Sequence, residues 1–73
     1  MSAPITPVQI IKSTHDSINS ASTVFELDSA MNAGDGCLNT LRQLELIDNG
    51  QWIRETNDLC SRTERRRTEL LRG

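Results

Sequence analysis

The sequence predicts an all-α protein in which a long N-terminal helix packs on a C-terminal antiparallel helical hairpin. Apolar residues recur at three- and four-residue steps along most of the chain, as on one face of a helix. Helix-capping patterns precede these segments, and Asp48-Asn49-Gly50 separates two of them. Because the chain has only 73 residues, we expect one helical domain over residues 1–73.

The first helix is expected over about residues 7–33, after a flexible tail at residues 1–5. Thr6 can cap this helix, Pro7 suits its first position, and Gln9 completes a capping box. Serines and threonines between residues 13 and 23 weaken the prediction, because their hydroxyls compete for backbone hydrogen bonds. A second capping pattern from Thr23 to Glu26 leaves an alternative, in which two short helices meet near residue 22. We favour the single helix.

Two further helices are expected over about residues 36–47 and 50–71. The stretch Asn32-Ala33-Gly34-Asp35-Gly36 predicts a break, with Gly34 as a left-handed C-cap and Asp35 as the next N-cap. If the hairpin turns at Asp48 and Asn49, residues whose numbers add to about 97 face each other. The predicted pairs are Leu44 with Ile53, Leu41 with Thr56, Leu38 with Leu59, and Cys37 with Cys60.

The facing cysteines have two interpretations. As thiols they would fill one layer of the core, and this is the interpretation we favour. A redox-switched disulfide that staples the hairpin is the alternative, since packed helices can bring two Cβ atoms close enough.

Composition favours a protein that binds a partner. Apolar residues make up 36% of the chain, with one Trp, one Phe and no Tyr, so its own core is small. Self-association as a homodimer, or docking on a larger protein, would add buried surface. The sequence has neither a secretory leader pattern nor an apolar stretch of membrane-spanning length, so we expect a cytoplasmic protein with free thiols and no membrane contact.

No catalytic, metal or cofactor site is expected. Two cysteines and one histidine, without a C-x-x-C motif, do not match a zinc site. The only histidine, His15, lies on a half-polar helix and is interpreted as a surface residue. Neither a G-x-S-x-G nucleophile motif nor a glycine-rich phosphate loop occurs.

The most suggestive polar feature is the arginine run of the last helix. Residues 62–72 hold five Arg and two Glu in a chain whose net charge is −2. The simplest interpretation is a solvated face with internal ion pairs, such as Asp58 with Arg62. The functional interpretation of the arginine run is a contact surface for a partner, because guanidinium groups bind carboxylates and phosphates through two hydrogen bonds. The candidate partner-binding residues are Trp52, Arg62, Arg65, Arg66, Arg67, Glu26 and Asp28.

The function expected from these features is a small non-enzymatic adaptor or inhibitor that docks on a larger protein or protein complex. Helical proteins of this size often serve bacteria, phages and other mobile elements as antidotes or anti-host factors, anti-CRISPR proteins among them. The alternative is a nucleic-acid-associated regulator that contacts phosphates through the Arg-rich last helix. Nucleic acid ranks lower as a partner, because stacking aromatics are missing near the arginines and the sequence pI is about 5.2.

Overall fold

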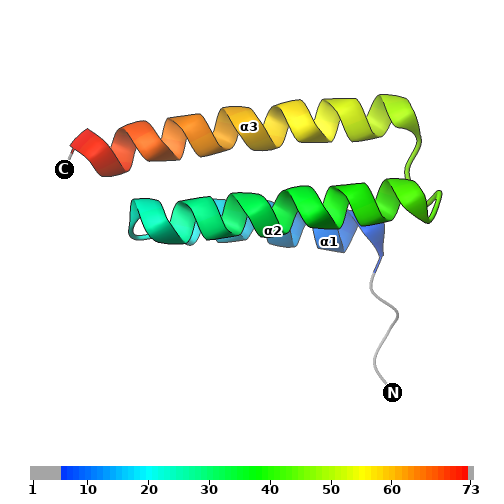
Figure 1. Cartoon of the computed structure of the whole chain (residues 1–73), viewed down its shortest axis with the longest axis horizontal. Helices are drawn as coiled ribbons and strands as arrows, with labels where there is room; N and C mark the ends of the chain where they lie inside the picture. The colour runs from blue at the N-terminus through cyan, green and yellow to red at the C-terminus, as the bar shows by residue number, and fades with distance from the viewer. Residues whose placement is uncertain (1–5, 73) are drawn as a thin grey trace, which may run out of the picture.

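The fold consists of three helices, each antiparallel to the next along the chain. The structure is a computed structural model and describes residues 6–72. Within this range the elements are α1 (Pro7–Ser20), α2 (Val24–Gln43) and α3 (Asn49–Arg72), without strands. α2 and α3 run antiparallel, and α1 lies against α2 on the side away from the viewer in Figure 1. The predicted small all-α fold is confirmed. The tail predicted at residues 1–5 lies outside the described residues.

The capping box predicted at the start of the first helix is confirmed. The backbone N–H of Gln9 donates to Thr6 Oγ1 at 3.2 Å, and Thr6 N–H donates to Gln9 Oε1 at 2.9 Å. Pro7 occupies the first turn, where its missing N–H costs no hydrogen bond.

The single long helix predicted over residues 7–33 is wrong, because the chain breaks at residues 21–23. Glu26 N–H donates to Thr23 Oγ1 at 3.0 Å, and the Glu26 carboxylate accepts from Ser22 N–H at 2.8 Å. Glu26 N–H is one of the backbone donors that the start of a helix leaves free, and Ser22 N–H lies in the break between the two helices. The second capping pattern therefore decides the structure, and it lets α1 fold back along α2.

The break predicted at residues 32–36 is also wrong, because α2 runs through it without interruption. Gly34 is buried in the middle of α2, where the helices approach each other closely. A Cβ atom at this position would lie 3.1 Å from Leu59 Cδ2 and 3.3 Å from Thr14 Cβ. Gly34 thus serves helix packing, and that packing outweighs the helix-propensity cost of about 1 kcal/mol for a glycine.

The turn of the hairpin lies at residues 44–48, earlier than predicted for the end of the second helix. Leu44 caps α2, Glu45 has a positive φ of 59°, and Asp48 Oδ1 accepts from Gln51 N–H at 2.7 Å as the N-cap of α3. The last helix, predicted over residues 50–71, is confirmed to within one residue at each end.

Because α2 ends earlier than predicted, the pairing of α2 with α3 is shifted from the predicted pairing by about four residues, which is one turn of a helix. Gly34 meets Leu59, and Asn39 accepts a hydrogen bond from Trp52. The predicted pairing of Leu44 with Ile53 is wrong, since the two side chains are 64% and 51% exposed. The predicted pairing of the cysteines is wrong as well: Cys37 faces α1, whereas Cys60 lies exposed on α3, and both are free thiols.

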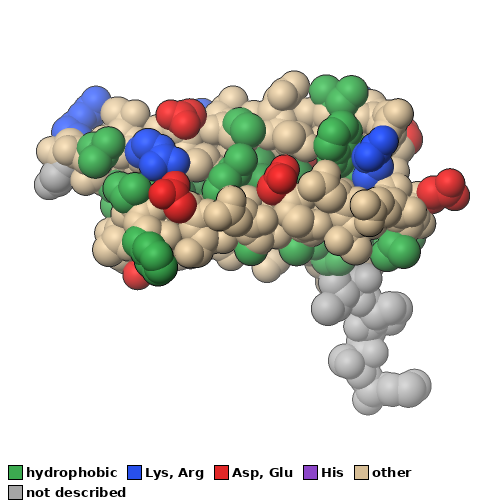
Figure 2. Space-filling model, in the orientation of Figure 1, with side chains coloured by type: hydrophobic (Ala, Val, Ile, Leu, Met, Phe, Trp, Pro, Cys, Tyr) green, Lys and Arg blue, Asp and Glu red, His purple; other side chains and the backbone are tan. Residues whose placement is uncertain are grey.

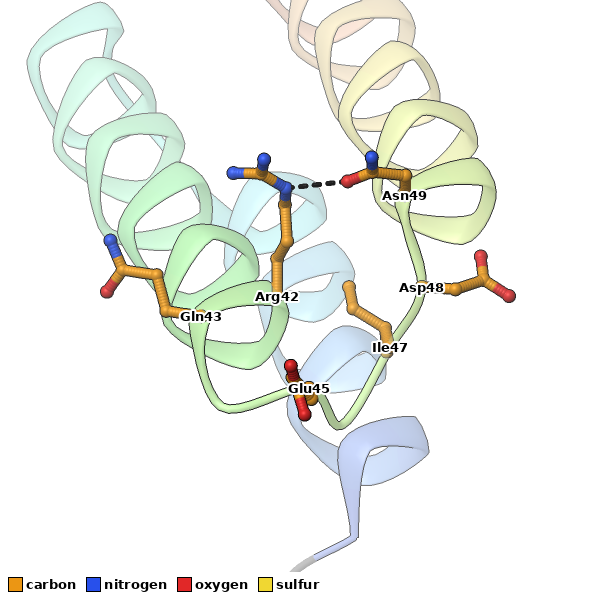
Figure 3. A pocket seen from close by; sticks show the side chains of 6 residues that line it. All are labelled: Arg42, Gln43, Glu45, Ile47, Asp48 and Asn49. Atoms are coloured by element: carbon orange, nitrogen blue, oxygen red, sulfur yellow. Dashed lines mark hydrogen bonds between the residues drawn. The ribbon is translucent and has the colours of Figure 1, made fainter.

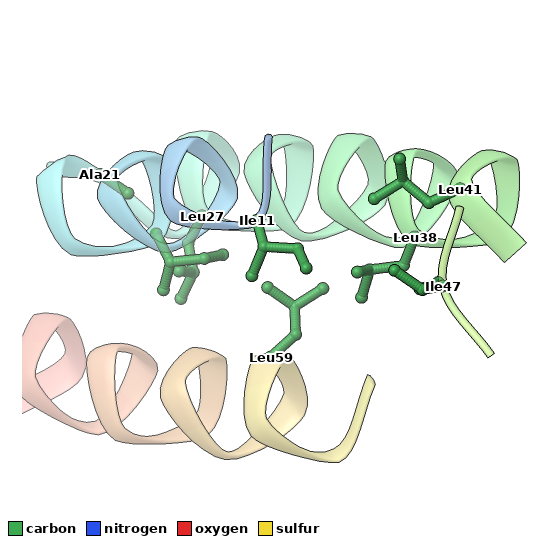
Figure 4. Close-up of a cluster of buried hydrophobic side chains, with 8 residues drawn as sticks. Ile11, Ala21, Leu27, Leu38, Leu41, Ile47 and Leu59 are labelled. Carbon is green, nitrogen blue, oxygen red and sulfur yellow. The ribbon is translucent and has the colours of Figure 1, made fainter. Parts of the chain in front are cut away.

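Leu59 stands at the centre of the core. Its side chain rises from α3 between Ile11 of α1 and Leu38 of α2 (Figure 4). Further buried leucines, isoleucines and one alanine extend the core along the helices, and the buried hydroxyls of Thr14 and Thr63 donate to their own helices. The buried apolar residues are Ile11, Ile18, Ala21, Leu27, Leu38, Leu41, Ile47 and Leu59.

Candidate protein-binding surface

Arg62 belongs to a cluster that joins α3 to α1. Its Nε lies 2.8 Å from Asp58 Oδ2, and His15 Nε2 of α1 lies 3.2 Å from the same oxygen. The hydrogen bond from Arg62 lowers the pKa of Asp58, partly opposed by burial, and the charges of Arg62, His15 and Arg65 lower it further. The i,i+4 pair that the sequence predicts is confirmed, and it has an additional partner on another helix.

Arg66 fastens α3 to the end of α1. Its guanidinium donates to the carbonyl oxygen of Ala21 from Nη2 at 2.8 Å and from Nε at 3.1 Å. The third nitrogen lies 3.4 Å from Glu69 Oε2. The Ala21 carbonyl lies where α1 ends and has no partner within that helix. Two nitrogens of the charged Arg66 guanidinium supply its hydrogen bonds.

Arg67 connects α3 to α2. Its Nη2 lies 2.8 Å from Asp28 Oδ1, and its Nε lies 4.0 Å from Glu64 Oε1. The hydrogen bond to Asp28 raises the pKa of Arg67, and the charge of Asp28 acts in the same direction. Two residues that the sequence proposes for a partner, Asp28 and Arg67, therefore bind each other.

Of the two remaining charged candidates, Glu26 is bonded within the described fold and Arg65 is not. Glu26 caps α2 through Ser22, as described above. Arg65 is exposed and has no hydrogen bond or ion pair with another residue between 6 and 72. Three of the four candidate arginines thus take part in polar contacts between helices: Arg62 through Asp58, Arg66 with Ala21 and Arg67 with Asp28. Their partner-binding role stays a prediction.

The hairpin end carries a different group of side chains. Trp52 is half-buried, its indole N–H donates to Asn39 Oδ1 at 3.0 Å, and the Arg42 guanidinium lies 4.7 Å from the centre of its ring. Arg42 Nε also donates to Asn49 Oδ1 at 2.8 Å across the turn (Figure 3). These contacts hold the Arg42 guanidinium over the indole ring, where cation–π attraction favours it.

A hollow of about 540 Å³ lies beside this stack. The residues that line it, shown in Figure 3, are Arg42, Gln43, Glu45, Ile47, Asp48 and Asn49. Ile53, which follows Trp52 in α3, is 51% exposed. We define the hairpin-end surface as Arg42, Trp52, Ile53, Asn49 and Asp48. Trp52 was a candidate from the sequence, but Arg42 was missed. The signal for it was an arginine in the last turn of one helix with a tryptophan in the first turn of the next.

A second hollowed region runs between α1 and α2. Its wider part, of about 450 Å³, is mainly apolar and lies between Ile10 and the pair Leu44 and Leu46. Its narrower part, of about 200 Å³, lies between Ser17 and Ala30. Ala33 and Cys37 line both parts, so they form one groove, which we call the α1–α2 groove.

Charges of both signs are interspersed on the face shown in Figure 2, with apolar side chains between them. Such a surface lacks the one-sign field that draws proteins to nucleic acid. Between residues 6 and 72, no three His, Cys, Asp or Glu side chains are grouped so as to hold a metal ion. No helix in this range has the length and apolar character needed to cross a membrane.

Comparison with family models, with curated proteins and with solved structures gives no match for this chain.

Proposed function

We propose that this chain is a small non-enzymatic adaptor or inhibitor that acts in the cytoplasm by docking its hairpin-end surface on a larger protein. The observation that carries the proposal is the Arg42–Trp52 stack at the edge of an open hollow. Trp and Arg are the residue types most enriched among interface hot spots. A stack already held by Asn39 and Asn49 also loses little conformational entropy on binding.

An exposed apolar side chain on the first turns of α3 supports the same proposal. Ile53 follows Trp52 in the sequence and is 51% exposed, so an apolar contact with a partner would remove it from water. The proposed biological role follows the class of small helical proteins that bacteria, phages and mobile elements use as antidotes or anti-host factors, including anti-CRISPR proteins. The arginines of α3 support nucleic-acid binding less well, because Arg62, Arg66 and Arg67 are already bonded within the fold.

The test is affinity capture from a bacterial lysate, followed by reconstitution with the purified captured protein. We expect one protein or complex to bind the natural chain and to bind Arg42→Ala and Ile53→Glu at least tenfold more weakly. Arg65→Ala, which changes an exposed arginine away from the hairpin end, should bind as the natural chain does. Equal binding by all variants would remove the hairpin-end surface from the proposal.

A titration of generic duplex DNA separates the nucleic-acid alternative. A phosphate-binding protein should bind the duplex at about 50 mM salt and lose affinity steeply by about 200 mM. Under the proposed function the chain leaves the duplex unbound at both salt concentrations. Tight binding at the lower concentration, weakened by Arg65→Ala, would instead establish the alternative.

A further inference from the structure

We propose that the α1–α2 groove is the contact face between two copies of this chain, arranged around a two-fold axis that passes close to Cys37. This proposal is independent of the hairpin-end surface, and three properties of the groove support it. They are its lack of charge, its internally bonded hydroxyls and the complementary shape of its two ends.

The charge pattern suits a second copy. Of the described residues that line the two parts of the groove, none is charged. In a two-fold contact each group near the axis meets its own copy, so any charge there would repel its equivalent. The arginines and carboxylates of α3 lie on another helix, and the lining of the groove can meet itself without this electrostatic cost.

Most hydroxyls in the lining of the groove already have a hydrogen-bond partner. The hydroxyls of Thr14, Ser17 and Thr40 each donate to a carbonyl of their own helix, at 2.6, 3.0 and 2.9 Å. The hydroxyl of Ser13, which is exposed, makes no such bond among residues 6–72. Since a buried hydroxyl without a hydrogen bond costs about 1–3 kcal/mol, three of the four hydroxyls can leave water without this cost.

The two ends of the groove have complementary shapes. At one end Leu44 and Leu46 are 64% and 54% exposed, so they project from the surface. At the other end the 200 Å³ hollow is lined by small side chains such as Ser17 and Ala30. A cavity of about 150 Å³ can hold a benzene ring, so this hollow has room for a leucine side chain.

This arrangement fixes where the axis lies. Leu44 and Ala30 are separated by about 20 Å along the axis of α2, at about 1.5 Å per residue. If the leucines of one copy enter the hollow of the other, and the reverse, the axis passes midway between them. Cys37 stands at that midpoint and lines both parts of the groove. The two Cys37 thiols of a dimer therefore lie near each other, whereas the two Cys60 thiols lie on α3, outside the contact.

Light scattering on the full chain provides the first measurement. We expect the mass to rise with concentration from 8.2 kDa towards twice that value. Leu46→Glu places a charge beside the axis-related copy and should keep the chain monomeric, with an unchanged circular dichroism spectrum. Ile53→Glu alters an equally exposed apolar residue outside the groove and should leave the dimer intact. A constant mass of 8.2 kDa up to millimolar concentration would overturn the proposal.

Thiol crosslinking provides the second measurement and locates the contact. A short bis-maleimide should convert the Cys60→Ser variant into covalent dimers through Cys37. It should leave the Cys37→Ser variant, which keeps only Cys60, largely uncrosslinked. Equal crosslinking of the two variants would place the contact elsewhere and overturn the proposal. Crosslinking through Cys37 tests the dimer without changing the hairpin end, and Ile53→Glu tests the partner contact without changing the groove, so failure of one proposal is distinguishable from failure of the other.

Discussion

Arg66 of α3 bonds to the carbonyl oxygen of Ala21, 45 residues earlier in the chain, through two guanidinium nitrogens at once. This contact joins the last helix to the point where the first one ends. Together with the contact of His15 with Asp58, it holds α1 against α3 although α2 separates them in sequence.

Replacement of Arg66 should destabilise the fold. Arg66→Ala leaves the partly buried Ala21 carbonyl without its charged donor, and we expect a loss of about 1.5–3 kcal/mol in the free energy of unfolding. Arg66→Lys keeps the charge but not the two-point contact, so it should lie in between. Urea unfolding followed by circular dichroism measures both. Arg65→Ala is the matched control, expected within about 0.5 kcal/mol of the natural chain, and an equal loss there would contradict this assignment.

The two glycines of α2 should respond in opposite directions to a larger side chain. A Cβ at Gly36 meets nothing within 4 Å, so Gly36→Ala should stabilise the helix by about 0.5–1 kcal/mol. Gly34→Leu would force its side chain against Leu59 and Thr14, with an expected cost of about 1–3 kcal/mol or more. Thermal unfolding at low micromolar concentration, where copies of the chain stay apart, checks both. A stable Gly34→Leu variant would contradict the close approach of the helices.

Acid should weaken the contact between α1 and α3. Because the pKa of Asp58 is lowered in the folded chain, its carboxylate stabilises the fold at pH values above its unfolded pKa of about 3.9. This contribution disappears as the pH falls through the folded pKa. Since the Asp58 side chain is 44% exposed, we expect it to be at most about 1 kcal/mol.

The comparison that isolates this effect is between the natural chain and Asp58→Asn. Their difference in free energy of unfolding, measured in urea between neutral pH and about pH 2, should shrink on acidification below about pH 4. Asp16→Asn, at an exposed position without an ion pair among residues 6–72, is the control. A difference that stays constant over this range would contradict the role of the Asp58 charge.

Loss of the Thr23 cap should destabilise the start of α2. Thr23→Ala removes the oxygen that accepts from Glu26 N–H, at an expected cost of about 0.5–2 kcal/mol. Thr23→Ser and Thr23→Asp should retain most of the stability in thermal unfolding. Thr68→Ala changes an exposed hydroxyl within α3 and serves as the control. If the helical content of Thr23→Ala rises instead, α1 and α2 have fused and the cap does not define the break.

The sequence predicts the helical class well because apolar spacing and capping patterns are local signals. Thr6 with Gln9, and Asp48 with Gln51, make the caps that their spacing predicts. The second capping pattern, at Thr23, was visible too. It competed with a continuous apolar stripe, and only the antiparallel packing of α1 on α2 decides between the two.

Contacts between helices decide the features that the sequence predicts wrongly. Gly34 resembles a helix stop in isolation, but Leu59 and Thr14 make it a packing position. The register of the hairpin depends on the left-handed backbone of Glu45, a residue without the conformational preference of glycine. The contact of Arg42 with Trp52 was not predictable for the same reason: it depends on the observed pairing of α2 with α3, which differs from the predicted pairing by about one helical turn.

The short connections at residues 21–23 and 44–48 also govern how quickly the chain folds. Neighbouring helices can pair without closing a long loop, which is the property of small helical proteins that fold within microseconds to milliseconds. The contacts of α1 with α3 join non-consecutive helices, so we expect α1 to pack on α3 last, when Arg66 reaches Ala21. Newly made copies would then spend little time half-folded, with correspondingly little opportunity to aggregate.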